Sequence, residues 1–254
     1  MAIPDGDIDI ISAFKKVSLE EQHVSWPLSD CTIHSALGKH NTQDLINLIL
    51  EGGLKLKCIS PVISKAMLFA HILQRSKEAA KYDPAMLAAA TLTLSSASYD
   101  EDIDKTMVVL TFHHMMKKEY LLDLLGETKF NLDKYLKETE LMLFRMLDGI
   151  TSHKIAHEYV PFFSQNLIPL TEVSSVWQPF ITTVWKIISD FYMSELCLDF
   201  KACDIAVVAN HVALMVCKVK SYLPSDWYQD FSPGLTMETK NRLSRVMINI
   251  CSQN

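Results

Sequence analysis

Glycine is scarce in this chain, with 7 among 254 residues, and no cluster of glycines has the spacing of a phosphate-binding loop. Such loops need glycine because only a residue without a side chain lets the backbone approach a phosphate closely. The G-x-S-x-G turn that presents a nucleophilic serine in many hydrolases is absent as well. The sequence therefore offers no case for catalysis, and we expect neither an enzyme nor a cofactor.

Paired cysteines and long apolar runs are also missing. The 6 cysteines include no C-x-x-C pair, and most lie in apolar periodic segments, which favours buried, reduced thiols in an intracellular protein. The first residues, MAIPDGDIDI, lack the basic start of a secretory signal. No apolar run reaches the length that a bilayer requires. These absences predict a nuclear or cytoplasmic protein that does not contact a membrane.

Positive charge is in the minority. The formal net charge is −6 and the pI is about 5.8, and the basic residues are scattered along the chain. Proteins that bind nucleic acids through phosphate contacts usually carry a basic stripe. We therefore expect no direct binding to a nucleic acid.

Two stretches resemble metal-binding motifs, but their spacing does not match. His153, His157 and Glu158 have the order H-x-x-x-H-E, whereas the zinc-protease helix has H-E-x-x-H. The acidic run at 100–104 lacks the glycine and the closing glutamate of a calcium loop. We expect no metal site at either place.

Helical patterns dominate what is present. Apolar residues recur at intervals of three and four, as on one face of an amphipathic helix. Asp83-Pro84 and Ser60-Pro61 have the cap and first-turn residues that are favoured at helix starts. The expected helices cover residues 41–56, 60–74, 83–97, 103–120, 130–147, 176–192, 204–216 and 236–250.

Two of these segments carry more specific predictions. The helix that follows Asp83 is apolar on nearly all sides, so it should be central and wrapped by its neighbours. Gly52-Gly53 lies within a helical pattern and is expected to let two helices approach closely.

The second half of the chain repeats the pattern of the first. Pro179 corresponds to Pro61 and Ala206 to Ala88, each at a distance of 118 residues. Self-similarity at a fixed distance indicates a duplicated unit. We predict an all-α fold with two tandem five-helix domains, at 41–150 and 151–254. They follow an N-terminal extension, residues 1–40, with a possible short helix at 14–22.

Several of these segments resemble the cyclins. YDPAMLAAATLTLSSAS is similar to the third helix of a cyclin box, and YLKETELMLFRML is similar to the fifth. DIAVVANHVALMV and WYQDFSPGLTMETKNRLSRVMINI resemble their counterparts in a second box. Within the cyclins, LILEGGLKL and SELCLDFKACDIAVVANHVAL are most similar to cyclin Q (cyclin M), from which the chain has diverged. The resemblance covers about residues 41–251 and identifies the two predicted domains as cyclin boxes.

This resemblance implies a non-catalytic regulatory subunit that forms a heterodimer with a cyclin-dependent protein kinase. A cyclin activates its kinase by pushing a mobile helix of the kinase inward, which completes an ion pair needed for phosphoryl transfer. The kinase-binding surface would come from the ends of helices three to five of the first box. The glutamate of helix five matches Glu140, which Leu141 follows, and the apolar contact one turn later matches Phe144.

The match fails at the end of helix three. The lysine that usually closes this helix is replaced by Ala97, and the phenylalanine that often follows is replaced by Ser98. Tyr99 and Asp100 complete the predicted kinase-binding segment, and an aromatic position after helix five falls on Gly149. Losing one member of a buried interfacial charge pair typically costs ~2–5 kcal/mol.

Two functions therefore remain open. The first is a diverged cyclin that binds and activates or targets a cyclin-dependent kinase, in the cell cycle or in transcription regulation. The second is a cyclin-fold scaffold that no longer activates a kinase and recruits other proteins in transcription or meiotic recombination.

Overall fold

The computed structural model describes residues 42–75, 82–117, 122, 124–148 and 153–253, and it confirms the all-α prediction for them. Apart from one isolated β-bridge between Thr171 and Ser221, their regular structure is helical. The α-helices are α2 (Thr42–Lys55), α3 (Ser60–Gln74), α4 (Pro84–Ala97), α5 (Lys105–Lys117), α6 (Glu127–Met146), α7 (Val160–Leu167), α8 (Trp177–Tyr192), α9 (Ala202–Val216), α10 (Tyr228–Phe231) and α11 (Met237–Gln253). Short 3-10 helices are η3 (Ala156–Glu158), η4 (Ile168–Leu170), η5 (Val173–Val176) and η6 (Glu195–Asp199).

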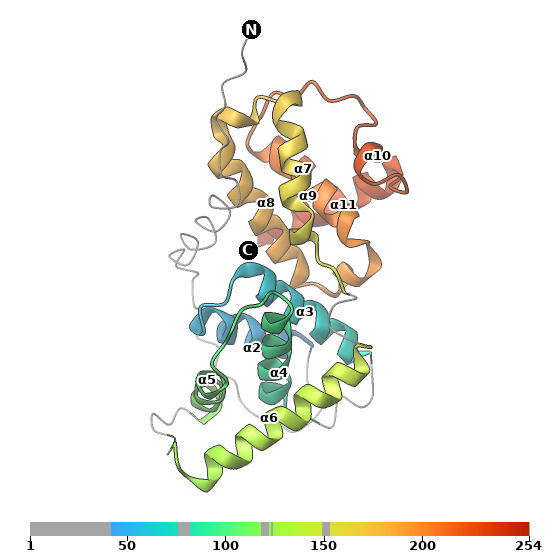
Figure 1. Ribbon diagram of the computed structural model, residues 1–254. Coiled ribbons are helices and arrows are strands. Elements are labelled where there is room, and N and C mark those ends of the chain that lie inside the picture. Colours follow the sequence, from blue (N-terminus) through green and yellow to red (C-terminus); the bar gives the residue numbers. More distant parts are fainter. Residues whose placement is uncertain (1–41, 76–81, 118–121, 123, 149–152, 254) are drawn as a thin grey trace.

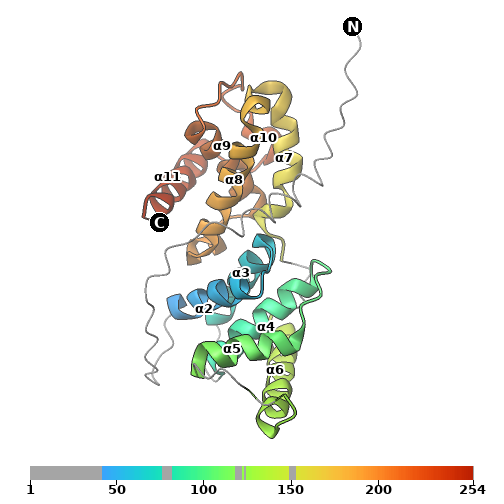
Figure 2. The same ribbon diagram turned by 90° about the vertical axis from the view of Figure 1, so that its left-hand side faces the viewer.

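The helices form two groups, α2–α6 and α7–α11, which Figure 1 shows one above the other and Figure 2 shows from the side. Within the first group α4 contacts α2, α3, α5 and α6, and within the second α9 contacts α7, α8 and α11. Helix α3 lies at the junction, where it contacts α8 and η6. Helix α6 runs along the edge of the first group that is farthest from the second.

The spacing of the helices repeats between the groups. Helices α7, α8 and α9 begin 118, 117 and 118 residues after α2, α3 and α4. The turns after α4 and α9 also correspond, because Asp100 and Lys218 both have a positive φ, 53° and 52°. This regularity agrees with the duplication inferred from the sequence. The predicted boundary between the domains, the extension at 1–40 and its possible helix lie outside the described residues.

Helix α4 has the central position predicted for it. Its start is fixed by Asp83, whose side chain accepts hydrogen bonds from the backbone N–H groups of Ala85 and Met86, and by Pro84 in the first turn. Most of its residues are buried on every side, as expected for a helix wrapped by four neighbours. The corresponding prediction for Ser60 was wrong: α3 starts after Ile59, and no side chain caps it.

The pair Gly52-Gly53 permits the close helix approach that its position suggested. A Cβ atom at Gly52 would overlap the buried ring of Phe112 on α5. A Cβ atom at Gly53 would lie 2.7 Å from Cγ1 of Ile63 on α3. Glycine therefore stands on α2 where two neighbouring helices press against its backbone.

The junction between the groups is polar as well as packed. His71 on α3 hydrogen-bonds through Nε2 to the backbone oxygen of Tyr192 on α8, at 3.0 Å. At the exposed edge, Arg75 pairs with Glu195 at 3.4 Å. These contacts join the C-terminal half of α3 and the residue after it to the end of α8 and to η6.

The described cysteines are all free thiols. Cys58 and Cys197 are buried, and burial raises the pKa of each thiol to about 12. Cys203, Cys217 and Cys251 are half-buried, and Cys31 lies outside the described part.

None of the described helices is both long and apolar enough to cross a membrane.

Candidate functional site

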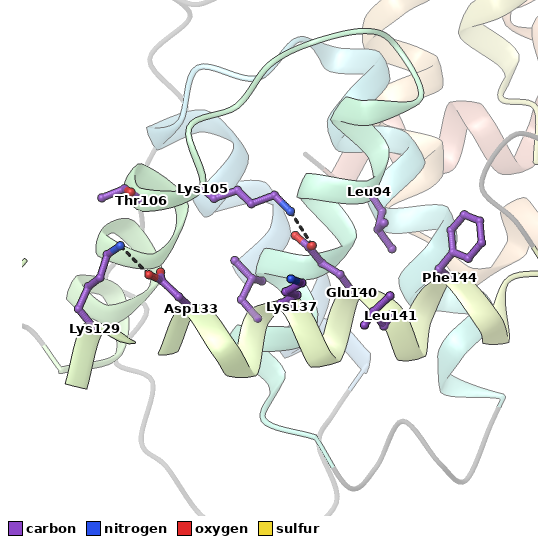
Figure 3. Close-up of a pocket in the computed structure, with 10 residues that line it drawn as sticks. Leu94, Lys105, Thr106, Lys129, Asp133, Lys137, Glu140, Leu141 and Phe144 are labelled. Carbon is purple, nitrogen blue, oxygen red and sulfur yellow. Dashed lines mark hydrogen bonds and ion pairs between the residues drawn. The ribbon is translucent and has the colours of Figure 1, made fainter. Parts of the chain in front are cut away.

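An open groove of about 540 Å³ runs along α6, on the side facing α4 and the start of α5. Figure 3 shows the side chains that line it, which come from three helices that pack together. The lining residues are Leu94, Lys105, Thr106, Lys129, Asp133, Leu136, Lys137, Glu140, Leu141 and Phe144. Three of the predicted kinase-binding residues, Glu140, Leu141 and Phe144, are therefore brought together in one groove.

Glu140 is the most unusual of these residues because it is a nearly buried carboxylate. Only 9% of its surface is exposed. Its Oε2 accepts a hydrogen bond from the ammonium of Lys105 at 2.6 Å, and Lys105 reaches across from the first turn of α5 (Figure 3). Its Oε1 is buried and has no hydrogen-bond partner. An unsatisfied buried acceptor costs free energy, so Glu140 is poised to accept a hydrogen bond from a donor that enters the groove.

Apolar side chains surround this polar pair. Leu136, which is buried, and Leu94 of α4, which is half-buried, line the same groove. Leu141 and Phe144 project from α6 with 52% and 49% of their surfaces exposed. Large apolar side chains exposed together around one polar anchor are typical of a protein-binding surface.

The two other lysines of the groove differ in whether they have an ion-pair partner. Lys129 pairs with Asp133 at 2.6 Å, one turn apart on α6. Lys137, which is exposed, has no ion-pair partner among the described residues. The groove therefore has three cations and two carboxylates, and after pairing one positive charge is left over.

The remaining predicted residues lie in the last turn of α4 or directly after it, and they do not line this groove. Ala97 is exposed in the last turn of α4. The hydroxyl of Ser98 donates to the backbone oxygen of Ser95 at 2.7 Å, and Asp100 is exposed in the turn with positive φ. The position Gly149 lies outside the described residues.

Tyr99 turns away from the groove toward the second group of helices. Its hydroxyl donates to Oε1 of Glu158 at 2.9 Å, and the ammonium of Lys65 lies 5.1 Å from its ring centre. Burial, together with the charge of Glu158, raises the pKa of Tyr99. Tyr99 thus joins α4 to η3, and any role at a partner surface remains a prediction.

Sequence reasoning missed Lys105, Lys137 and Leu94 as residues of the groove. Lys105 is 35 residues from Glu140, so no local pattern links the two residues. One signal was available: Lys105 is the first cation after the acidic run at 100–104, and it lies in the first turn of the helix predicted at 103–120. Lys105 thus places a cation beside Glu140 from α5, a different helix from α4, which ends at Ala97.

The histidines considered for metal binding have structural roles. His153 hydrogen-bonds through Nε2 to the backbone oxygen of Leu147 at 2.9 Å. His157 is buried against Trp185 and Tyr192, and its burial lowers its pKa to about 3. Within the described residues, no three side chains of His, Cys, Asp or Glu are grouped as metal ligands would be.

Comparison with known proteins finds similarity to a cyclin. No family model matches the chain. The Arabidopsis thaliana protein Cyclin-T1-3 is 22% identical over 200 residues, which is 79% of this chain and 61% of that protein. The chain thus spans less than two thirds of the length of this relative. The similarity supports a relationship to the cyclins in general and gives no specific support for cyclin Q.

Proposed function

We propose that this chain is a diverged cyclin, similar to cyclin Q, and that it binds a cyclin-dependent protein kinase as a non-catalytic regulatory subunit in the nucleus or cytoplasm. The relationship to the cyclins and the all-α fold support the class of protein. The observation that carries the proposal is Glu140, a buried carboxylate with one unpartnered oxygen, set among exposed apolar side chains. This arrangement is costly in an isolated chain and becomes favourable once a partner supplies a donor.

The groove is suited to binding and positioning a partner segment. Leu141 and Phe144 would bury their exposed surface against apolar side chains of the kinase, which supplies affinity. Glu140 and Lys105 would bind polar groups of the same segment, which fixes its register. Held in this way, a mobile helix of the kinase would be kept in the position that phosphoryl transfer requires.

Binding to purified cyclin-dependent kinases tests the proposal. The double variant Leu141→Ala/Phe144→Ala removes two exposed side chains, each worth ~1–2 kcal/mol if it is buried at an interface. We expect an affinity loss on the order of 100-fold for the kinase that binds the native chain. Phe130→Ala is the matched control, because Phe130 is exposed on the same helix but does not line the groove.

Circular dichroism should give the same helix content for all three proteins, because the altered side chains are exposed. Binding of the native chain to none of the kinases would contradict the proposal. An equal affinity for the double variant and the Phe130 control would contradict the assignment of the groove.

The end of α4 favours a second candidate, a cyclin-fold scaffold that recruits other proteins in transcription or meiotic recombination. Ala97 and Ser98 leave this end without the lysine expected of a kinase-activating cyclin. A stable native complex that contains other proteins and no kinase would support this candidate.

A further inference from the structure

We infer that Lys137 determines partner specificity, by selecting a partner segment that carries an acidic side chain next to an apolar one. The inference rests on the proposed function, because it concerns the same groove. Its starting point is the imbalance of charge: Lys105 and Lys129 are each paired at 2.6 Å, whereas Lys137 has no ion-pair partner among the residues described.

The position of Lys137 makes this charge relevant to a bound segment. It lies on α6 one turn before Leu141, so the two side chains are neighbours on the exposed face of the helix. Figure 3 shows Lys137 in the middle of the groove, between the Lys129–Asp133 pair and the apolar end at Phe144. A segment that inserts an apolar side chain near Leu141 therefore passes the ammonium of Lys137.

The groove specifies further chemistry of that segment. From Lys129 to Phe144 the lining extends about 22 Å along α6, from the rise of an α-helix, so it can hold a segment of several turns. Such a segment places a hydrogen-bond donor on Oε1 of Glu140 and an acidic side chain on Lys137. Because the cation stays in excess after the internal pairs are made, a basic segment is repelled. Kinases that present a basic side chain at this point are poor partners.

The test compares two lysines of one helix in the full chain. Lys137→Met removes the charge and Lys137→Glu reverses it, while Lys134→Glu makes the same reversal at an exposed residue that does not line the groove. Affinity is measured for the kinase that binds the native chain, at low and at high salt.

We expect Lys137→Glu to weaken binding on the order of tenfold or more at low salt, with a smaller effect at high salt. The affinity of Lys137→Met should lie between that of the native chain and that of Lys137→Glu. The affinity of Lys134→Glu should stay within about twofold of that of the native chain. Replacing the facing acidic residue of the kinase by lysine should restore binding to Lys137→Glu.

The other outcomes each overturn the inference. Equal losses of affinity for Lys134→Glu and Lys137→Glu would mean that the overall charge of the protein, and not a contact of Lys137, affects binding. No loss in either would mean that Lys137 does not meet the partner, and kinase binding would still stand. No kinase bound by the native chain would overturn the proposed function together with the inference.

Discussion

Removing the ammonium of Lys105 should destabilise the isolated chain measurably. Lys105→Met leaves the nearly buried carboxylate of Glu140 with no hydrogen-bond partner on either oxygen. Breaking a fully buried pair typically costs 3–5 kcal/mol, and an exposed pair is worth 0.2–1 kcal/mol. The side chain of Lys105 is 63% exposed, so water can replace part of its contact with Glu140. We therefore expect a loss of ~1–2 kcal/mol in the free energy of unfolding.

A double-mutant cycle with Glu140→Gln isolates the interaction. Glutamine has no charge to leave uncompensated, so Glu140→Gln should be neutral or stabilising in the Lys105→Met background and destabilising in the native one. Urea unfolding followed by circular dichroism measures all four proteins at neutral pH. Lys129→Met is the control, because its one-turn pair with Asp133 should contribute no more than ~0.5 kcal/mol. Additive effects of the two substitutions, or a Lys105→Met protein as stable as the native chain, would refute the reasoning.

Three further predictions concern the core and the site. Burial raises the pKa of Asp190 to about 6 from its ordinary 3.8. As pH rises, the unfolded chain therefore releases this proton at a lower pH than the folded chain does, so the free energy of unfolding falls between pH 3.8 and pH 6. Asp190→Asn should therefore be more stable than the native chain by ~1–2 kcal/mol at pH 7.5 and by much less at pH 4.5, in urea unfolding at both pH values. Gly52→Ala should cost ~1–3 kcal/mol in thermal unfolding because the new methyl group overlaps the ring of Phe112, and an unchanged midpoint would contradict this packing. Ala97→Lys should keep or strengthen affinity for the kinase, since Ala97 is exposed and the family places a lysine there; a tenfold loss would contradict the match between Ala97 and the lysine of the family.

The helices were largely predictable because their signals are local. Asp83 and Pro84 predict the start of α4, and the structure confirms both the cap and the central burial of the helix. Helix α7 was not predicted, because at eight residues it is too short for a periodic pattern to stand out. Ser60 has a residue type that favours caps, yet the chain places Ile59 at the cap position, where no side chain can donate or accept.

The site was predictable only in part because it depends on contacts between distant segments. Glu140, Leu141 and Phe144 follow one another on a single helix, so one resemblance identified all three. Lys105 belongs to another helix, and its pairing with Glu140 follows from how α5 packs on α6, which no spacing in the sequence encodes. Tyr99 shows the same dependence: the resemblance placed it in the predicted kinase-binding segment, and its hydroxyl donates to Glu158, a contact between distant segments that no spacing in the sequence encodes.

The most direct test of the central claim is mass spectrometry of the native complex of the tagged full chain, with a protein kinase assay on the same material. A stoichiometric cyclin-dependent kinase with activity that depends on the chain is the result we predict. It would mean that the chain binds and activates a kinase although Ala97 replaces the lysine of the family. A stable complex that contains other proteins and no kinase at any salt concentration would contradict the account.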